Sequence, residues 1–321
     1  MKKLGLSLLL ASLAISVLPA HVLAAKVSVN GLTLTPAIEQ ISLLKGQASA
    51  SFSATVTNNT KNPEVITIST TDFTALNNTG GVEFLRSSTQ PNNSHGLAEW
   101  LKPGVTQFAL SAGGIQTIPI SIANVTSLAP GGHYGAVVFK VVPTIASSKK
   151  NQISSNEDIS MLVFLTTYGG GIQSVKLDNP PINSFTLHMP SSVDLVFTNN
   201  GNTQTAPVGL VTVTNSSNHE IARGIINIDS GLVLPATSGL FIVKLNYEHN
   251  FNLPGNYHIN IIYQADSSAI VTTYVKKFVF IDEQIVILII VGLLALAIFV
   301  IRKLNPIPVT KEHRTIKIKI T

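Results

Sequence analysis

Short runs in which apolar and polar residues alternate fill the chain between its two ends, and this period of two is typical of β-strands with one buried face. Clusters of Asn, Gly, Ser and Pro separate the runs, as expected of turns. No convincing helical period appears outside the termini. The predicted strands cover residues 51–57, 65–71, 115–122, 135–142 and 159–167 in a first series, and 172–177, 193–198, 209–214, 221–228, 240–245, 257–264 and 270–281 in a second. The pattern therefore predicts an all-β protein.

Each series holds enough short strands to close a two-sheet core of its own, and the seven strands of the second series match the number that an immunoglobulin-like sandwich has in roughly 100 residues. We therefore expect two tandem immunoglobulin-like β-sandwiches, domain one over residues 25–168 and domain two over residues 172–281. Three consecutive glycines, 169–171, mark the boundary as a flexible joint or a tight reversal. The polar stretch 144–158 is expected to be a long exposed hairpin loop, since a boundary there would expose an edge of domain one.

The two ends of the chain carry the signals of export and anchoring. Residues 1–24 have the basic start, apolar centre and small-residue exit of a secretory signal peptide, and an uncleaved N-terminal anchor is the alternative. Residues 285–301 form an uninterrupted apolar run without a polar face, which predicts a transmembrane helix rather than a buried one. Six basic residues against one acidic residue in 302–321 place that tail in the cytoplasm. The sequence thus predicts a single-pass type I protein of the cell membrane with an extracellular ectodomain.

Charge and cysteine content remove several other classes of protein. The net charge is +5, but eight of the 21 basic residues lie in the signal peptide and the tail, so the ectodomain is slightly acidic. Nucleic acid is therefore not an implied partner. Cysteine is absent, so the ectodomain must fold without disulfides and has no thiol nucleophile or zinc–thiolate site. We also find no catalytic or phosphate-binding motif, and we expect no enzyme activity, no metal and no cofactor.

Several short motifs resemble a known family. They lie at residues 34–36, 44–46, 56–58, 100–101, 108 and 129–135 in domain one, and at 197–202, 207–209, 233–235 and 254–257 in domain two. They resemble the tandem ectodomains of bacterial surface proteins, above all the WxL-interacting proteins of Gram-positive walls. The segment Gly131-Gly132-His133-Tyr134-Gly135 resembles a wider class of surface sandwiches equally well. The resemblance implies noncovalent attachment, with one sandwich toward peptidoglycan and the other toward a surface protein.

Three aromatic residues in these motifs are the candidate ligand contacts: Trp100, His133 and Tyr134. Trp100 at a rim could stack against a sugar ring, and the alternative is that it is a core aromatic. The run 199–202 supplies asparagine and glycine, which tolerate the positive φ of tight turns. Most of the motif residues are therefore expected to be structural.

Two functions remain open. The first is a membrane-anchored interaction or scaffold protein whose partner is a cell-wall polymer or a surface protein. The alternative is a membrane-tethered assembly chaperone that acts on exported subunits by β-strand augmentation. Because strand 270–281 ends almost at the membrane segment, we expect domain two to sit against the bilayer and domain one to swing outward on the glycine joint.

Overall fold

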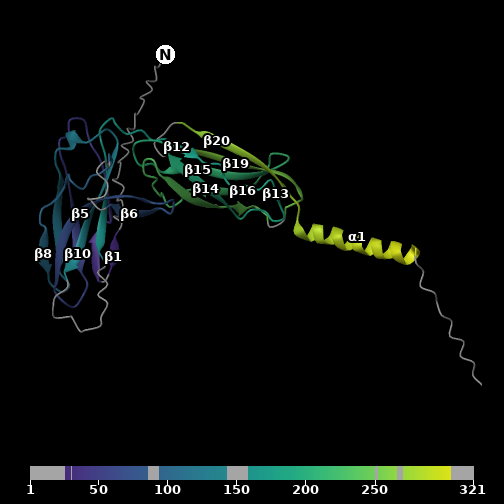
Figure 1. Cartoon of the computed structure of the whole chain (residues 1–321), viewed down its shortest axis with the longest axis horizontal. Coiled ribbons are helices and arrows are strands. Elements are labelled where there is room, and N and C mark those ends of the chain that lie inside the picture. Colours follow the sequence, from purple (N-terminus) through teal and green to yellow (C-terminus); the bar gives the residue numbers. More distant parts are fainter. Residues whose placement is uncertain are drawn as a thin grey trace, which may run out of the picture.

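The computed structural model describes residues 26–29, 31–85, 94–142, 158–249, 252–265 and 270–304. It confirms the predicted fold class: two immunoglobulin-like β-sandwiches follow one another and a single apolar helix comes last (Figure 1). The predicted signal peptide, almost all of the predicted loop 144–158 and most of the basic tail lie outside the described residues.

Domain one packs two sheets face to face. The first sheet has the order β1 (Val27–Val29), β2 (Leu32–Thr35), β4 (Ala50–Asn58), β9 (Ile115–Ile122) and β7 (Leu101–Pro103). The second has the order β3 (Ile38–Ser42), β11 (Ile159–Thr166), β10 (Gly132–Val142), β5 (Glu64–Leu76) and β6 (Gly81–Leu85), with β8 (Gln107–Leu110) also paired to β5. Alternate residues of both sheets fill the core, including Leu34, Val56, Ile66, Ile118, Ile120, Phe139 and Val163.

Domain two repeats the arrangement with sheets of unequal size. The small sheet has three strands, β12 (Val175–Leu177), β14 (Ser192–Asn199) and β17 (Ser238–Lys244). The large sheet has the order β13 (Phe185–Thr186), β20 (Thr272–Phe280), β19 (Gly255–Ala265), β15 (Pro207–Asn215), β16 (Glu220–Ile226) and β18 (Asn246–Tyr247). Their shared core includes Leu195, Phe197, Val211, Val213, Ile259, Ile261 and Phe278.

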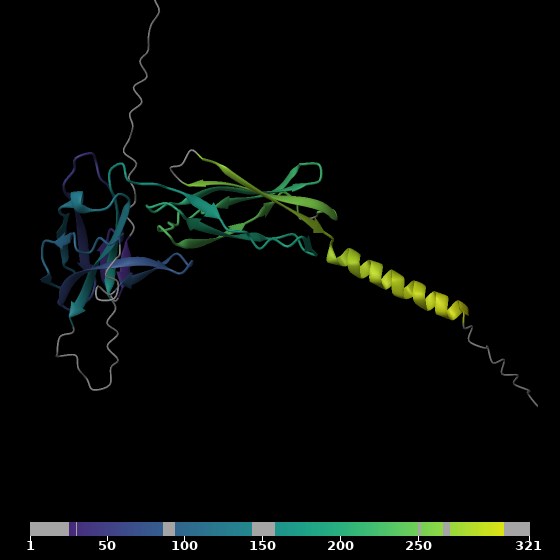
Figure 2. The same ribbon diagram turned by 45° about the horizontal axis from the view of Figure 1, so that its top comes forward.

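A third buried cluster joins the two sandwiches. Phe73, Tyr134 and Phe164 on the outer face of β5, β10 and β11 pack against Leu234 of domain two, with edge-to-face contacts among the three rings. In addition, the turn between β5 and β6 reaches across, and the Leu240 N–H donates to the Asn78 carbonyl at 2.9 Å. Figure 2 shows this hairpin projecting from domain one toward domain two. The domains are therefore packed as one body.

This packing corrects the expectation of a swinging joint. The side chain of Asn202 in domain two donates to the Gly170 carbonyl at 2.8 Å and to the Pro130 carbonyl at 3.2 Å. A Cβ on Gly170 would lie 2.6 Å from the Pro130 Cβ, closer than real contacts allow. Glycine is thus required there by close packing, not by hinge motion. The long axis of domain one lies crosswise to the long axis of domain two, so the two sandwiches form an L (Figure 1).

Helix α1 (Glu283–Leu304) continues from the end of β20 and projects away from both sandwiches (Figure 1). Its 22 residues are long and apolar enough, by length and composition, to cross a membrane. It begins earlier than the apolar run because Asp282 acts as its cap: the Gln284 N–H donates to the Asp282 carboxylate at 2.8 Å.

Candidate functional site

The three residues predicted as ligand contacts do not form a common site. Trp100 is half-buried against the core of domain one, and its indole N–H donates to the Ser127 hydroxyl at 3.0 Å. His133 and Tyr134, at the start of β10, are each only 2% exposed. The ring nitrogens of His133 face the carbonyls of Ala129 at 2.8 Å and Gly96 at 3.3 Å. Ligand contact stays a prediction for all three, and the burial of His133 and Tyr134 favours structural roles for these two.

Tyr134 belongs to the junction between the domains. Its hydroxyl donates to the Gln204 side-chain carbonyl at 3.1 Å, which spans the interface. Burial raises the pKa of Tyr134 well above its ordinary value, so the phenol stays neutral and continues to donate. In the described part of the chain, no group of three or more His, Asp or Glu side chains could hold a metal ion.

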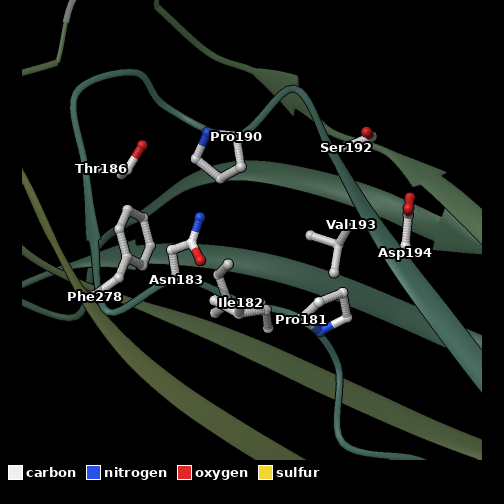
Figure 3. A pocket seen from close by; sticks show the side chains of 10 residues that line it. Pro181, Ile182, Asn183, Thr186, Pro190, Ser192, Val193, Asp194 and Phe278 are labelled. Carbon is white, nitrogen blue, oxygen red and sulfur yellow. The ribbon is translucent and has the colours of Figure 1, made fainter.

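A hollow of about 270 Å³ opens between the two sheets of domain two (Figure 3). The apolar part of its lining is formed by the core residues Val193, Ile259 and Phe278. Asn183 and Val193 point into it from opposite walls (Figure 3). The complete lining is Pro181, Ile182, Asn183, Thr186, Pro190, Ser192, Val193, Asp194, Ile259 and Phe278. The hollow therefore combines access to the core with a polar rim.

The hollow exists because the first strand of domain two leaves its sheet early. Strand β12 pairs with β14 only from Val175 to Leu177, and the last bond runs from the Asp178 N–H to the Val196 carbonyl at 2.9 Å. Bonds to β14 recur at every second residue, so in this register the next residue to bond would be Pro180, which would lie opposite Asp194. Proline has no N–H and cannot continue the ladder. The ladder accordingly ends at Asp178.

A tight turn then takes the chain to the other sheet. The Ile182 N–H donates to the Pro180 carbonyl at 2.8 Å, which closes a three-residue turn around Pro181. Two residues later, Ser184 accepts from the Val279 N–H, and β13 pairs in parallel with β20. Among the described residues, the crossing leaves the first half of β14 without a neighbouring strand on this side.

The uncovered half of β14 presents backbone hydrogen-bonding groups. In an antiparallel ladder, successive residues bond alternately to the two neighbouring strands. Val196 bonds toward β12, whereas Ser191 and Asn199 bond toward the β17 side. By this alternation Ser192 and Asp194 direct their N–H and C=O groups toward the hollow. Within the described ranges, no backbone or side-chain group bonds to them on that side.

The chain segment between the rim residues Thr186 and Pro190 contacts the base of the apolar helix. The His188 Nε2 atom lies 2.9 Å from the Glu283 carboxylate at the first residue of α1. At the end of the same segment, the Tyr247 hydroxyl donates to the Pro190 carbonyl at 2.8 Å. The hollow thus opens at the end of domain two from which the helix departs.

Comparisons with known proteins give a fold likeness and no family. No protein-family model matches the chain, and no curated protein matches it. One solved structure, described as a chaperone-tip adhesin complex vital for synergistic activation of CFA/I fimbriae biogenesis, is 16% identical with a TM-score of 0.42, covering 76% of this chain and 98% of that one. The class 5 fimbriae chaperone CfaA is 14% identical with a TM-score of 0.41, over 76% of this chain and 98% of its own.

The YadV chaperone is 14% identical with a TM-score of 0.38, over 77% of this chain and all of its own. With identities this low and TM-scores below 0.5, none of these likenesses carries an argument about function. The resemblance to WxL-interacting proteins stays a prediction.

One feature of the sequence marks the hollow. Pro180-Pro181 begins three residues after the end of the predicted strand 172–177, and proline stops any ladder. The sequence does not show which strand these prolines leave uncovered. That depends on the pairing of β12 with β14, which joins residues far apart in the chain and leaves no local pattern.

Proposed function

We propose that the protein is a membrane-tethered extracellular interaction protein that holds another exported or surface protein through a sheet edge. The observation that carries this proposal is the uncovered half of β14 above an apolar hollow. Exposed edges are templates for pairing with another chain, and native proteins usually cover them. An edge left open beside access to the core is suited to a polypeptide partner.

The rest of the molecule supports a scaffold role. The two sandwiches are packed together through Phe73, Tyr134, Phe164 and Leu234, so the ectodomain presents its surfaces in fixed geometry. Helix α1 supplies a tether whose length and composition suit a bilayer. A backbone edge matches another backbone better than it matches a polysaccharide, so we favour a protein partner over a cell-wall polymer.

The second candidate function is an assembly chaperone for exported subunits, and the same open edge favours it. A chaperone would hold many unfolded clients briefly, whereas a scaffold would hold one folded partner for a long time. The fimbrial proteins named above are chaperones, and that likeness is too low to choose between the two roles.

The test is affinity purification of the full chain from cross-linked cells that express it. A scaffold should yield one protein in near-equal amount, and a chaperone should yield several exported subunits that disappear when new synthesis is stopped. Recovery of glycan alone, or of no partner above the level of an unrelated single-pass protein, would contradict both roles.

A further inference from the structure

We infer that the hollow beside β14 takes an extended peptide segment of the partner, antiparallel to β14, with a basic residue opposite Asp194 and a large apolar residue next to it. This inference rests on the proposed function and names the chemistry that its site recognises. It commits to a segment of another exported protein as the occupant.

The backbone geometry fixes the form of the occupant. Asp194 offers both its N–H and its C=O to the open side, and an antiparallel neighbour exchanges both bonds with one residue. Such a segment would continue the line and direction of β12, which is already antiparallel to β14. The uncovered stretch from Ser192 to Leu195 accommodates about four residues at roughly 3.4 Å each.

Alternation along β14 fixes which side chains go where. Val193 is buried and lines the hollow, while Asp194 is exposed on the outer face. Residues directly opposite each other in a sheet share a face. The peptide residue opposite Asp194 therefore points outward, and the next residue, opposite Val193, points into the hollow.

The hollow selects a large apolar side chain. Its volume of about 270 Å³ lies below the range of about 300–1,000 Å³ for pockets that take drug-sized molecules. It is instead suited to a side chain such as Phe, Leu or Ile. Burying such a side chain over Ile259 and Phe278 should lower the Kd about tenfold to hundredfold relative to alanine.

Charge on the outer face selects the neighbouring residue. On its β17 side, Asp194 is directly opposite the exposed Ile242 and therefore has no cation as its cross-strand partner. Lys244 of β17 is opposite Ser192 instead. A Lys or Arg opposite Asp194 would make a cross-strand ion pair, and an acidic residue would be repelled. The expected signature is a basic residue followed by a large apolar residue within an extended segment.

The test uses the full chain in nanodiscs and a labelled, end-blocked peptide, Gly-Thr-Val-Lys-Phe-Thr-Gly, with binding followed by fluorescence polarisation. Changing Phe to Ala should weaken binding at least tenfold, and changing Lys to Asp should weaken it severalfold. Asp194→Asn should keep binding and abolish the preference for Lys over Asp. No measurable binding of the parent peptide would overturn the inference.

Two protein variants test the location. Asp194→Pro removes the central N–H, which faces away from β17, and should abolish binding. Asn183→Trp fills the hollow from its wall and should weaken binding at least tenfold, whereas Asn183→Ala should not. Because Asp194→Pro could fail to fold, Asn183→Trp decides the question if circular dichroism shows lost structure. Unchanged binding in Asn183→Trp would overturn the inference.

The remaining outcomes separate this inference from the proposed function. A cellular partner that Asn183→Trp still retains would leave the function standing and refute the site. Peptide binding without any cellular partner would refute the function alone. If the full chain forms dimers that Asn183→Trp dissociates, the occupant is a second copy, and the assignment to a partner protein is wrong.

Discussion

One buried asparagine closes the same strand end in each domain. Asn58 at the end of β4 and Asn199 at the end of β14 are both fully buried. Each side-chain amide donates to backbone carbonyls across the strand end, and each carbonyl accepts an N–H two residues later. None of residues 199–202 has a positive φ, so the interpretation of this run as positive-φ turn residues was wrong. The motif works through side-chain hydrogen bonds instead.

This role predicts that replacing Asn199 destabilises the protein much more than replacing its neighbour Asn200. Asn199→Ala should lower the free energy of unfolding by about 2–4 kcal/mol, because the buried Thr203 carbonyl loses the Asn199 donor and the Val233 carbonyl keeps only the Thr205 N–H. Asn200→Ala, one residue on and exposed, should change it by less than about 0.5 kcal/mol. Urea denaturation followed by circular dichroism measures both. Equal losses in the two variants would refute the assignment.

At the scale of elements, the packing between domains decides how the ectodomain unfolds. Leu234 is 6% exposed and lies in the cluster formed by Phe73, Tyr134 and Phe164. We predict one cooperative thermal transition for the wild-type chain. Leu234→Asp should split it into two, because a carboxylate buried without a partner breaks the junction while leaving both cores intact.

Leu253→Asp provides the control, since Leu253 is 69% exposed and lies outside that cluster. It should leave the single transition unchanged in calorimetry, and small-angle scattering should show the same L-shaped envelope as the wild type. If the wild-type chain already melts in two independent steps, the junction is weaker than its contacts indicate.

The sequence locates the central strands but misses short edge strands. Strand β9 (Ile115–Ile122) has the predicted bounds, because strict alternation of buried and exposed residues runs along its whole second half. By contrast, β3 (Ile38–Ser42) and β13 (Phe185–Thr186) were not predicted. Their pairing is parallel to distant strands and their side chains are mostly exposed, so no local period marks them. The hollow was not predicted for the same reason, because its position is set by the point at which β12 stops pairing with β14.

At the scale of the whole molecule, the position of α1 predicts the topology. Protease added to intact cells stripped of their wall should digest both sandwiches and leave a small protected fragment that contains α1. The basic residues after α1 favour this orientation. Immunoblotting with an antibody against the C-terminal tail detects the fragment, and detergent should abolish its protection. Protection of the sandwiches in intact cells would show the opposite orientation.

The place of the hollow at the base of domain two decides how a partner would find it. His188, which lies in the chain between the rim residues Thr186 and Pro190, contacts Glu283, the first residue of α1. If α1 spans a bilayer, a partner anchored in the same membrane would meet the hollow by lateral diffusion, and confinement would raise its effective concentration without any new contact. A weak intrinsic affinity is then sufficient for occupancy, and the same segment released into solution would dissociate. Recognition would then depend on the location of both proteins in the same membrane as much as on the sequence of the bound peptide segment.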